Sequence, residues 1–128
     1  MTDDGGAAPE AGETDRARLM IVDDDPQVRT VVAEFVQDIG YHVIQASNGD
    51  EALALLERNP DLHMMITDIR MPGMSGIELA DVATQRRRDL KVILISGYFV
   101  AQQVRRRFLR KPFRMRDLEA AIRDELNA

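Results

Sequence analysis

Residues 18–40, RLMIVDDDPQVRTVVAEFVQDIG, contain the pattern of a strand followed directly by the pattern of a helix. The first five, RLMIV, form a short continuous apolar run, which is typical of a strand covered on both faces. Apolar residues then recur with the spacing of one helix stripe, at Val28, Val31, Val32, Phe35 and Ile39. Asp25 and Pro26 supply an N-cap and a first-turn proline, and Gly40 ends the helix. The stretch predicts a buried strand followed directly by an amphipathic helix.

The same alternation continues along the chain. Further strands are predicted at residues 41–46, 62–67, 91–96 and 107–110. Further helices are predicted at residues 49–59, 75–87 and 115–126. Asn48 caps the first of these helices, and Pro60 stops it. Strands that alternate with helices, with no room for tight hairpins, indicate parallel pairing through right-handed crossovers. We therefore expect an α/β protein with a five-stranded parallel sheet and helices on both faces.

The composition limits the classes of protein to which the chain can belong. The chain has 128 residues, a net charge of −5 and no cysteine, which excludes disulfides, a thiolate nucleophile and zinc–thiolate sites. Its apolar runs are far shorter than the roughly 20 residues of a membrane span. No basic patch of nucleic-acid-binding type dominates the domain. Residues 1–17 are interpreted as a disordered acidic N-terminal tail and residues 18–127 as one domain, which we expect to be cytoplasmic.

Polar side chains follow four of the predicted strands at the point where each strand ends. These are Asp23, Asp24 and Asp25 after the first strand, Asp68 after the third, Ser96 after the fourth and Lys111 after the fifth. Because the carboxyl ends of parallel strands meet at one edge of the sheet, where ligands of such sheets bind, we expect these groups to converge. Asp25 is read separately as a helix cap, since it precedes Pro26.

Crowded carboxylates repel one another, and a hard divalent cation relieves that repulsion at low cost. Mg2+ fits best, with Mn2+ as the alternative, because Mg2+ takes one or two carboxylates and keeps waters or phosphate oxygens. A lysine and a hydroxyl opposite the acids suit an anion that arrives with the metal. A phosphoryl group meets both requirements, and an aspartate can itself accept it as an acyl phosphate.

Four motifs in order carry a resemblance to a known family. VDDD at 22–25, TDIRMPGMSG at 67–76, ISG at 95–97 and KPF at 111–113 resemble the receiver domain of two-component response regulators. The resemblance covers nearly all of residues 18–127. It implies a flavodoxin-like three-layer fold with strand order 2-1-3-4-5.

The resemblance also implies roles for the acidic residues. Asp68 would be the phosphoacceptor and a metal ligand. Asp24, with Asp23 helping through water, would bind Mg2+, and the backbone carbonyl of Arg70 would be a further ligand.

The remaining motif residues would surround the phosphoryl group. Ser96, followed by Gly97, would hydrogen-bond a phosphoryl oxygen and act as a switch. Lys111, before a cis proline at Pro112, would pair with the phosphate. Phe108 occupies the position of the family's aromatic switch, although a lone aromatic residue in a short strand equally suits a core role.

These roles predict a phosphoacceptor signalling module and not an enzyme that turns over a separate substrate. A sensor histidine kinase or histidine phosphotransfer protein would donate to Asp68, and the charge would switch a protein-interaction surface. Because the chain shows no further domain, we expect a stand-alone response regulator. The alternatives are a receiver from a hybrid histidine kinase, an aspartyl-phosphate phosphohydrolase and a phosphate-independent interaction domain. Phosphohydrolases of that class commonly have a second acid where this chain has Arg70.

The segment between the fourth and fifth predicted strands is short. If RFLR at 107–110 is the fifth strand, only residues 97–106, ten positions, connect it to Ser96. A parallel crossover generally needs a dozen or more residues. We therefore predict that the fourth helix of the resembled fold is short or irregular here.

Overall fold

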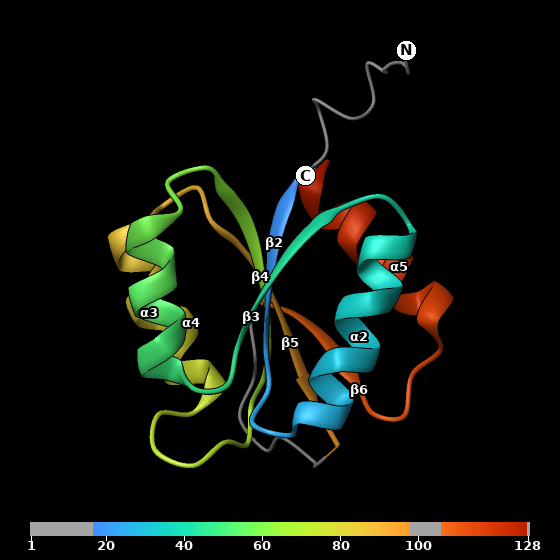
Figure 1. Cartoon of the computed structure of the whole chain (residues 1–128), viewed down its shortest axis with the longest axis horizontal. Helices are drawn as coiled ribbons and strands as arrows, with labels where there is room; N and C mark the ends of the chain where they lie inside the picture. The colour runs from blue at the N-terminus through green and yellow to red at the C-terminus, as the bar shows by residue number, and fades with distance from the viewer. Residues whose placement is uncertain (1–16, 98–105, 128) are drawn as a thin grey trace.

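The computed structural model describes residues 17–97 and 106–127. Its core is a five-stranded parallel sheet in the order β3-β2-β4-β5-β6 (Figure 1). The strands are β2 Arg18–Val22, β3 His42–Ala46, β4 Leu62–Asp68, β5 Lys91–Ser96 and β6 Arg107–Arg110. In chain order this is 2-1-3-4-5, so the predicted sheet and its strand order are confirmed.

Four helices in the described residues cover the two faces of the sheet (Figure 1). Helices α3 (Gly49–Arg58) and α4 (Gly76–Arg86) pack on one face, here called the α3/α4 face. Helices α2 (Pro26–Asp38) and α5 (Met115–Leu126) pack on the other, the α2/α5 face. The three-layer flavodoxin-like architecture follows from this arrangement.

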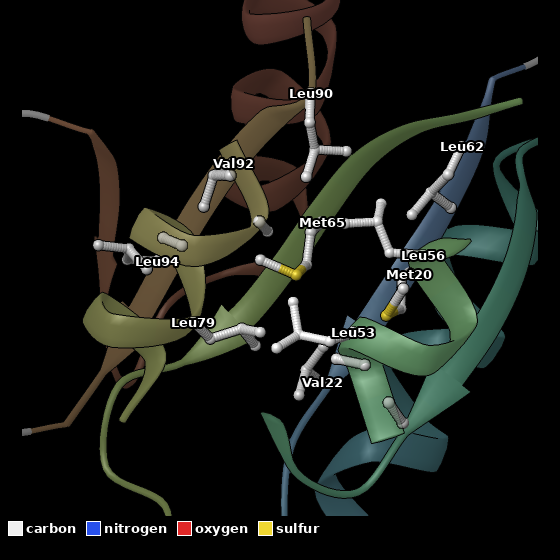
Figure 2. Packing of buried hydrophobic residues seen from close by; sticks show 14 of the residues in the cluster. Met20, Val22, Leu53, Leu56, Leu62, Met65, Leu79, Leu90, Val92 and Leu94 are labelled. Carbon is white, nitrogen blue, oxygen red and sulfur yellow. The ribbon is translucent and has the colours of Figure 1, made fainter. Parts of the chain in front are cut away.

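Successive strand residues point alternately into two separate cores. In β2, Met20 and Val22 belong to the core on the α3/α4 face, and Leu19 and Ile21 to the core on the α2/α5 face. Figure 2 shows the first of these cores, in which Met65 of β4 lies among side chains from the helices and neighbouring strands. Burial on both faces is the reason why β2 and β5 have nearly continuous apolar sequences.

Side-chain caps set the residue at which each of the first three helices begins. Asp25 Oδ1 accepts from the backbone N–H of Gln27 at 2.9 Å, as predicted for the cap of α2. Asn48 Oδ1 accepts from the N–H of Glu51 at 2.8 Å. Ser75 and Glu78 form a reciprocal capping box at the start of α4. Because each cap lies a few residues beyond a strand, the strand ends and the helix starts crowd together at the carboxyl edge.

The described residues include the two ends of the predicted short connection but not its middle. Strand β6 forms where RFLR predicted it and pairs with β5, with Ser96 opposite Arg110. The predicted irregular helix four falls on residues 98–105, which lie outside the described residues. Of the predicted N-terminal tail only Ala17 is described; it is buried, and its carbonyl accepts from the N–H of His42 at 3.1 Å.

Across residues 17–97 and 106–127, the helices are all too short or too polar to cross a membrane.

Candidate functional site

The carboxyl edge of the sheet contains a pocket of about 710 Å³. Asp23 and Asp24 enter it from the loop that follows β2. Asp68, the last residue of β4, and Lys111, the first residue after β6, also line it. The structure therefore brings together the acids and the lysine that the strand-end argument predicted to converge. Asp68 itself pairs with β5 and so belongs to the strand, one residue beyond its predicted end.

The three acids form a cluster that suits a divalent cation. One carboxylate oxygen each from Asp23, Asp24 and Asp68 can be chosen so that all lie within 4.8 Å of one another. Asp24 is exposed, whereas only 6% of the Asp23 surface is exposed. Carboxylate oxygens at this spacing are the ligands that Mg2+ prefers in proteins. The donor set thus fits the predicted metal.

Burial raises the pKa of the Asp23 carboxyl, and the neighbouring charges of Asp68 and Asp24 raise it further. The backbone N–H of Asp25 donates to Asp23 Oδ1 at 3.0 Å, and this bond and the Lys111 charge lower the same pKa. Burial is the largest of these effects, so a proton binds Asp23 more readily than an ordinary aspartate. A cation would offset both the burial of this carboxylate and the repulsion around it.

Lys111 connects two members of the acid cluster. Its Nζ lies 3.4 Å from Asp68 Oδ2 and 3.7 Å from Asp23 Oδ2. Its backbone N–H donates to the carbonyl of Ser96 at 2.8 Å, which ties the end of β6 to the end of β5. The Lys111–Pro112 peptide bond is cis, as the resemblance implied. The ammonium is therefore held at the acid cluster by its own backbone as well as by its charge.

The two predicted switch residues, Ser96 and Phe108, are not in the pocket lining. Ser96 ends β5 and is 1% exposed, while its neighbour Gly97 lines the pocket. Phe108 is partly buried and packs against the core on the α3/α4 face. It lies opposite Leu94 in the pairing of β6 with β5. A core role for Phe108 agrees with this packing, and the switch roles of both residues stay predictions.

The loop after β4 forms one wall of the pocket. Arg70 is exposed and lines the pocket together with Met71 and Pro72. The loop is joined to the strand end where the N–H of Gly76 donates to the carbonyl of Ile69 at 2.8 Å. Arg70 thus lies at the pocket, where its backbone carbonyl was predicted to act as a ligand.

Sequence reasoning did not single out Arg29, which contacts the acid loop from α2. Its Nη1 donates to the backbone carbonyl of Asp23 at 2.7 Å, and its Nε donates to Gln45 Oε1 at 3.1 Å. The available signal was its position in the first turn of a helix that starts directly after the acids.

A second, largely apolar groove of about 520 Å³ opens next to the acid pocket. It runs between α2, including Val28 and Val31, and the segment after β6 that includes Phe113. Asp68 and Lys111 also line it, so the groove and the acid pocket are continuous. Among the described residues, Val31 is the exposed large hydrophobic residue, with 54% of its surface exposed.

Comparisons with known proteins agree with this geometry. The family model described as "Response regulator receiver domain" matches residues 19–123. The response regulator receiver protein CpdR of Brucella abortus is 36% identical over 119 residues, which is 87% of this chain and 98% of that protein. The sensor kinase CckA of the same organism is 29% identical over 118 residues, 86% of this chain but only 12% of the kinase.

Solved structures agree as well. The crystal structure of the response regulator TrrA of Thermotoga maritima, in complex with Mg(2+)-BeF, is similar with a TM-score of 0.78 and 30% identity. The similarity covers 84% of this chain and 97% of that one. The match thus spans nearly all of two relatives and a small part of a third.

Proposed function

The chain belongs to the response regulator receiver domain family of two-component signalling, and on this premise we propose that Asp68 accepts a phosphoryl group from a phosphohistidine. The donor is a sensor histidine kinase or a histidine phosphotransfer protein. The observation that carries the proposal is the position of the Asp68 carboxylate, which lies close to two further carboxylates and to the Lys111 ammonium.

The transfer is a displacement at phosphorus. A carboxylate oxygen of Asp68 forms the new bond, and the bond from the histidine nitrogen to phosphorus breaks. Its electron pair stays on the imidazole, which leaves neutral because its other nitrogen carries the proton. Mg2+ supplies charge neutralisation for the phosphoryl oxygens, and Asp23, Asp24, Asp68 and the Arg70 carbonyl would hold it, with Mn2+ as a substitute.

Lys111 has two successive tasks in this reaction. Before transfer its ammonium offsets part of the negative charge of Asp68 and Asp23, as the two short ion-pair distances indicate. After transfer it pairs with a phosphoryl oxygen, because that oxygen carries more negative charge than the phosphorylated carboxyl group. Ser96, tied to Lys111 through the backbone, donates to another phosphoryl oxygen. The new charge then biases a protein-interaction surface that includes Phe108.

In this proposal the donor protein docks at the apolar groove. Because it is continuous with the pocket at Asp68, an element of the donor that covers Val31 could hold its phosphohistidine near the acceptor. An apolar contact would also exclude water from the reacting group.

The context that we favour is a stand-alone, cytoplasmic single-domain regulator. The match along 98% of the CpdR sequence supports it. The alternative is a receiver of a hybrid histidine kinase, supported by the match to part of CckA. An aspartyl-phosphate phosphohydrolase is disfavoured because Arg70 stands where such enzymes commonly have a second acid.

The test uses the chain with Mg2+ and acetyl phosphate, followed by intact mass. We expect the gain of one phosphoryl group in the parent chain and none in Asp68→Asn. Asp89→Asn, which removes an exposed acid away from the pocket, is the matched control and should still be labelled. Labelling of Asp68→Asn at the parent level would refute the assignment.

A further inference from the structure

Arg29 makes two directed hydrogen bonds from the first turns of α2. Its guanidinium donates through Nη1 to the carbonyl of Asp23 at 2.7 Å. It donates through Nε to the side chain of Gln45, on the neighbouring strand β3, at 3.1 Å. The planar guanidinium therefore bridges the start of the acid loop and the adjacent strand.

The carbonyl that Arg29 contacts belongs to the peptide unit that joins Asp23 to Asp24. On the other side of Asp23, its N–H donates to the carbonyl of Ala46 at 3.2 Å. The peptide orientation determines the direction in which the Asp24 side chain leaves the backbone. The last paired residues of β2 and β3 are Val22 and Ala46, and just beyond them the Arg29 side chain donates to this carbonyl.

We propose that Arg29 is a positioning residue, which holds the Asp23–Asp24 peptide so that both carboxylates face the Mg2+ site. The inference rests on the proposed function, because it assumes that these acids bind the metal. The acids repel one another in the free protein, so a backbone restraint is needed to keep them together. Arg29 supplies that restraint through a carbonyl and leaves the carboxylate oxygens available to the metal.

The position of the second contact explains why the residue is arginine. Gln45 accepts from Nε while Nη1 donates to the Asp23 carbonyl, so the two bonds use different nitrogens of one planar group. A lysine at this position would keep the charge but lose the rigid fork. Groups that orient metal ligands in this way typically change metal affinity by about tenfold or more when they are removed.

The experiment is a Mg2+ titration of the folded protein, followed through the backbone amide signals of the acid loop by NMR. The variants are Arg29→Met, Arg29→Lys and Gln45→Leu. The control is Arg58→Met, which removes an arginine from the last turn of α3. Spectra are recorded well below the melting temperature of every variant, so that only folded molecules are compared.

We expect Arg29→Met to weaken Mg2+ binding about tenfold, Arg29→Lys and Gln45→Leu to weaken it less, and Arg58→Met to leave it unchanged. Equal affinity in Arg29→Met and the parent would overturn the inference and leave Arg29 a purely structural contact. An equal loss in Arg58→Met would overturn it too, because the effect would then be general.

The result separates this inference from the proposed function. If the parent binds Mg2+ and Arg29→Met weakens binding, the inference holds even if Asp68 is never phosphorylated. If the parent binds no Mg2+, both fail together.

Discussion

Gly76, the first residue of α4, lies directly against the backbone of Asp68. A Cβ at Gly76 would meet the Asp68 carbonyl oxygen and would lie 2.9 Å from the Ile69 Cα. The neighbouring atoms are backbone, which cannot rotate away as a flexible side chain could. The start of α4 and the strand end that carries the proposed phosphoacceptor are therefore packed without room for a methyl group.

Gly76→Ala should consequently shift the Asp68 backbone. We expect a loss of about 1–3 kcal/mol in the free energy of unfolding, as for overpacked sites, together with slower labelling by acetyl phosphate. Urea denaturation and intact mass measure the two effects. Gly97→Ala is the control for the stability measurement, because its Cβ would make an ordinary contact at 3.6 Å with Lys111 Cβ. Equal stability of Gly76→Ala and the parent would contradict the packing argument.

Asp23→Asn should make the folded protein more stable near neutral pH. The pKa of Asp23 is raised in the folded state from its ordinary value of 3.8, so the folded state binds this proton more tightly than the unfolded state. The parent therefore loses stability from this group as the pH rises through the window above 3.8, and the asparagine variant does not.

We expect the difference in unfolding free energy to be small near pH 4 and to grow as the pH rises toward 7, because burial opposes the charged carboxylate. Urea denaturation across this range measures it, with Asp89→Asn as the control for the loss of one charge. A stability difference that shrinks as the pH rises would contradict the assigned direction. Mg2+ binding should weaken in the same variant.

Lys111→Met should separate phosphoryl transfer from metal binding. The ammonium 3.4 Å from Asp68 is expected to stabilise the transferred group, so labelling by acetyl phosphate at saturating Mg2+ should slow about 100-fold. Because the variant lacks the ammonium that competes with Mg2+ for the acid cluster, its Mg2+ affinity should equal or exceed that of the parent. Lys91→Met, at the other end of β5, is the control. Loss of Mg2+ binding in Lys111→Met would instead indicate that the lysine organises the cluster.

Val31→Glu should discriminate between a protein donor and a small donor. A charge in the apolar groove would oppose docking of the kinase or phosphotransfer protein, and transfer should slow about tenfold, whereas labelling by acetyl phosphate should not change. Thr30→Glu places the same charge on the adjacent exposed position of α2 and is the matched control. Equal slowing with both donors would show that the mutation damages the site and not the docking surface.

Most of the sheet could be predicted because its signals are local. The central strands β2 and β5 are nearly continuous apolar runs, and parallel strands bring their carboxyl ends together, so the convergence of Asp23, Asp68 and Lys111 followed from topology. The capping box of Ser75 and Glu78 was also readable from its spacing, although only the caps of the two preceding helices were predicted.

The long-range arginine contacts could not be predicted. Arg87 follows a helix within a run of arginines, a pattern that is typical of solvated cations at a helix end. In the structure its guanidinium donates to backbone carbonyls around the end of α3, at 2.6 Å to Leu56 and 3.1 Å to Leu62. Arg29 is similar, because its partners become neighbours only when β2, β3 and α2 have assembled. Local patterns carry no information about such bonds.

The hydrogen bond from Lys111 to the Ser96 carbonyl has a consequence for evolution. The two residues are set side by side by strand pairing and by this bond, and not by the length of the chain that connects them. Insertions and deletions within residues 97–106 can then accumulate without separating the backbones of Ser96 and Lys111. Selection can then change the sequence of that segment while the backbones of Ser96 and Lys111 stay joined.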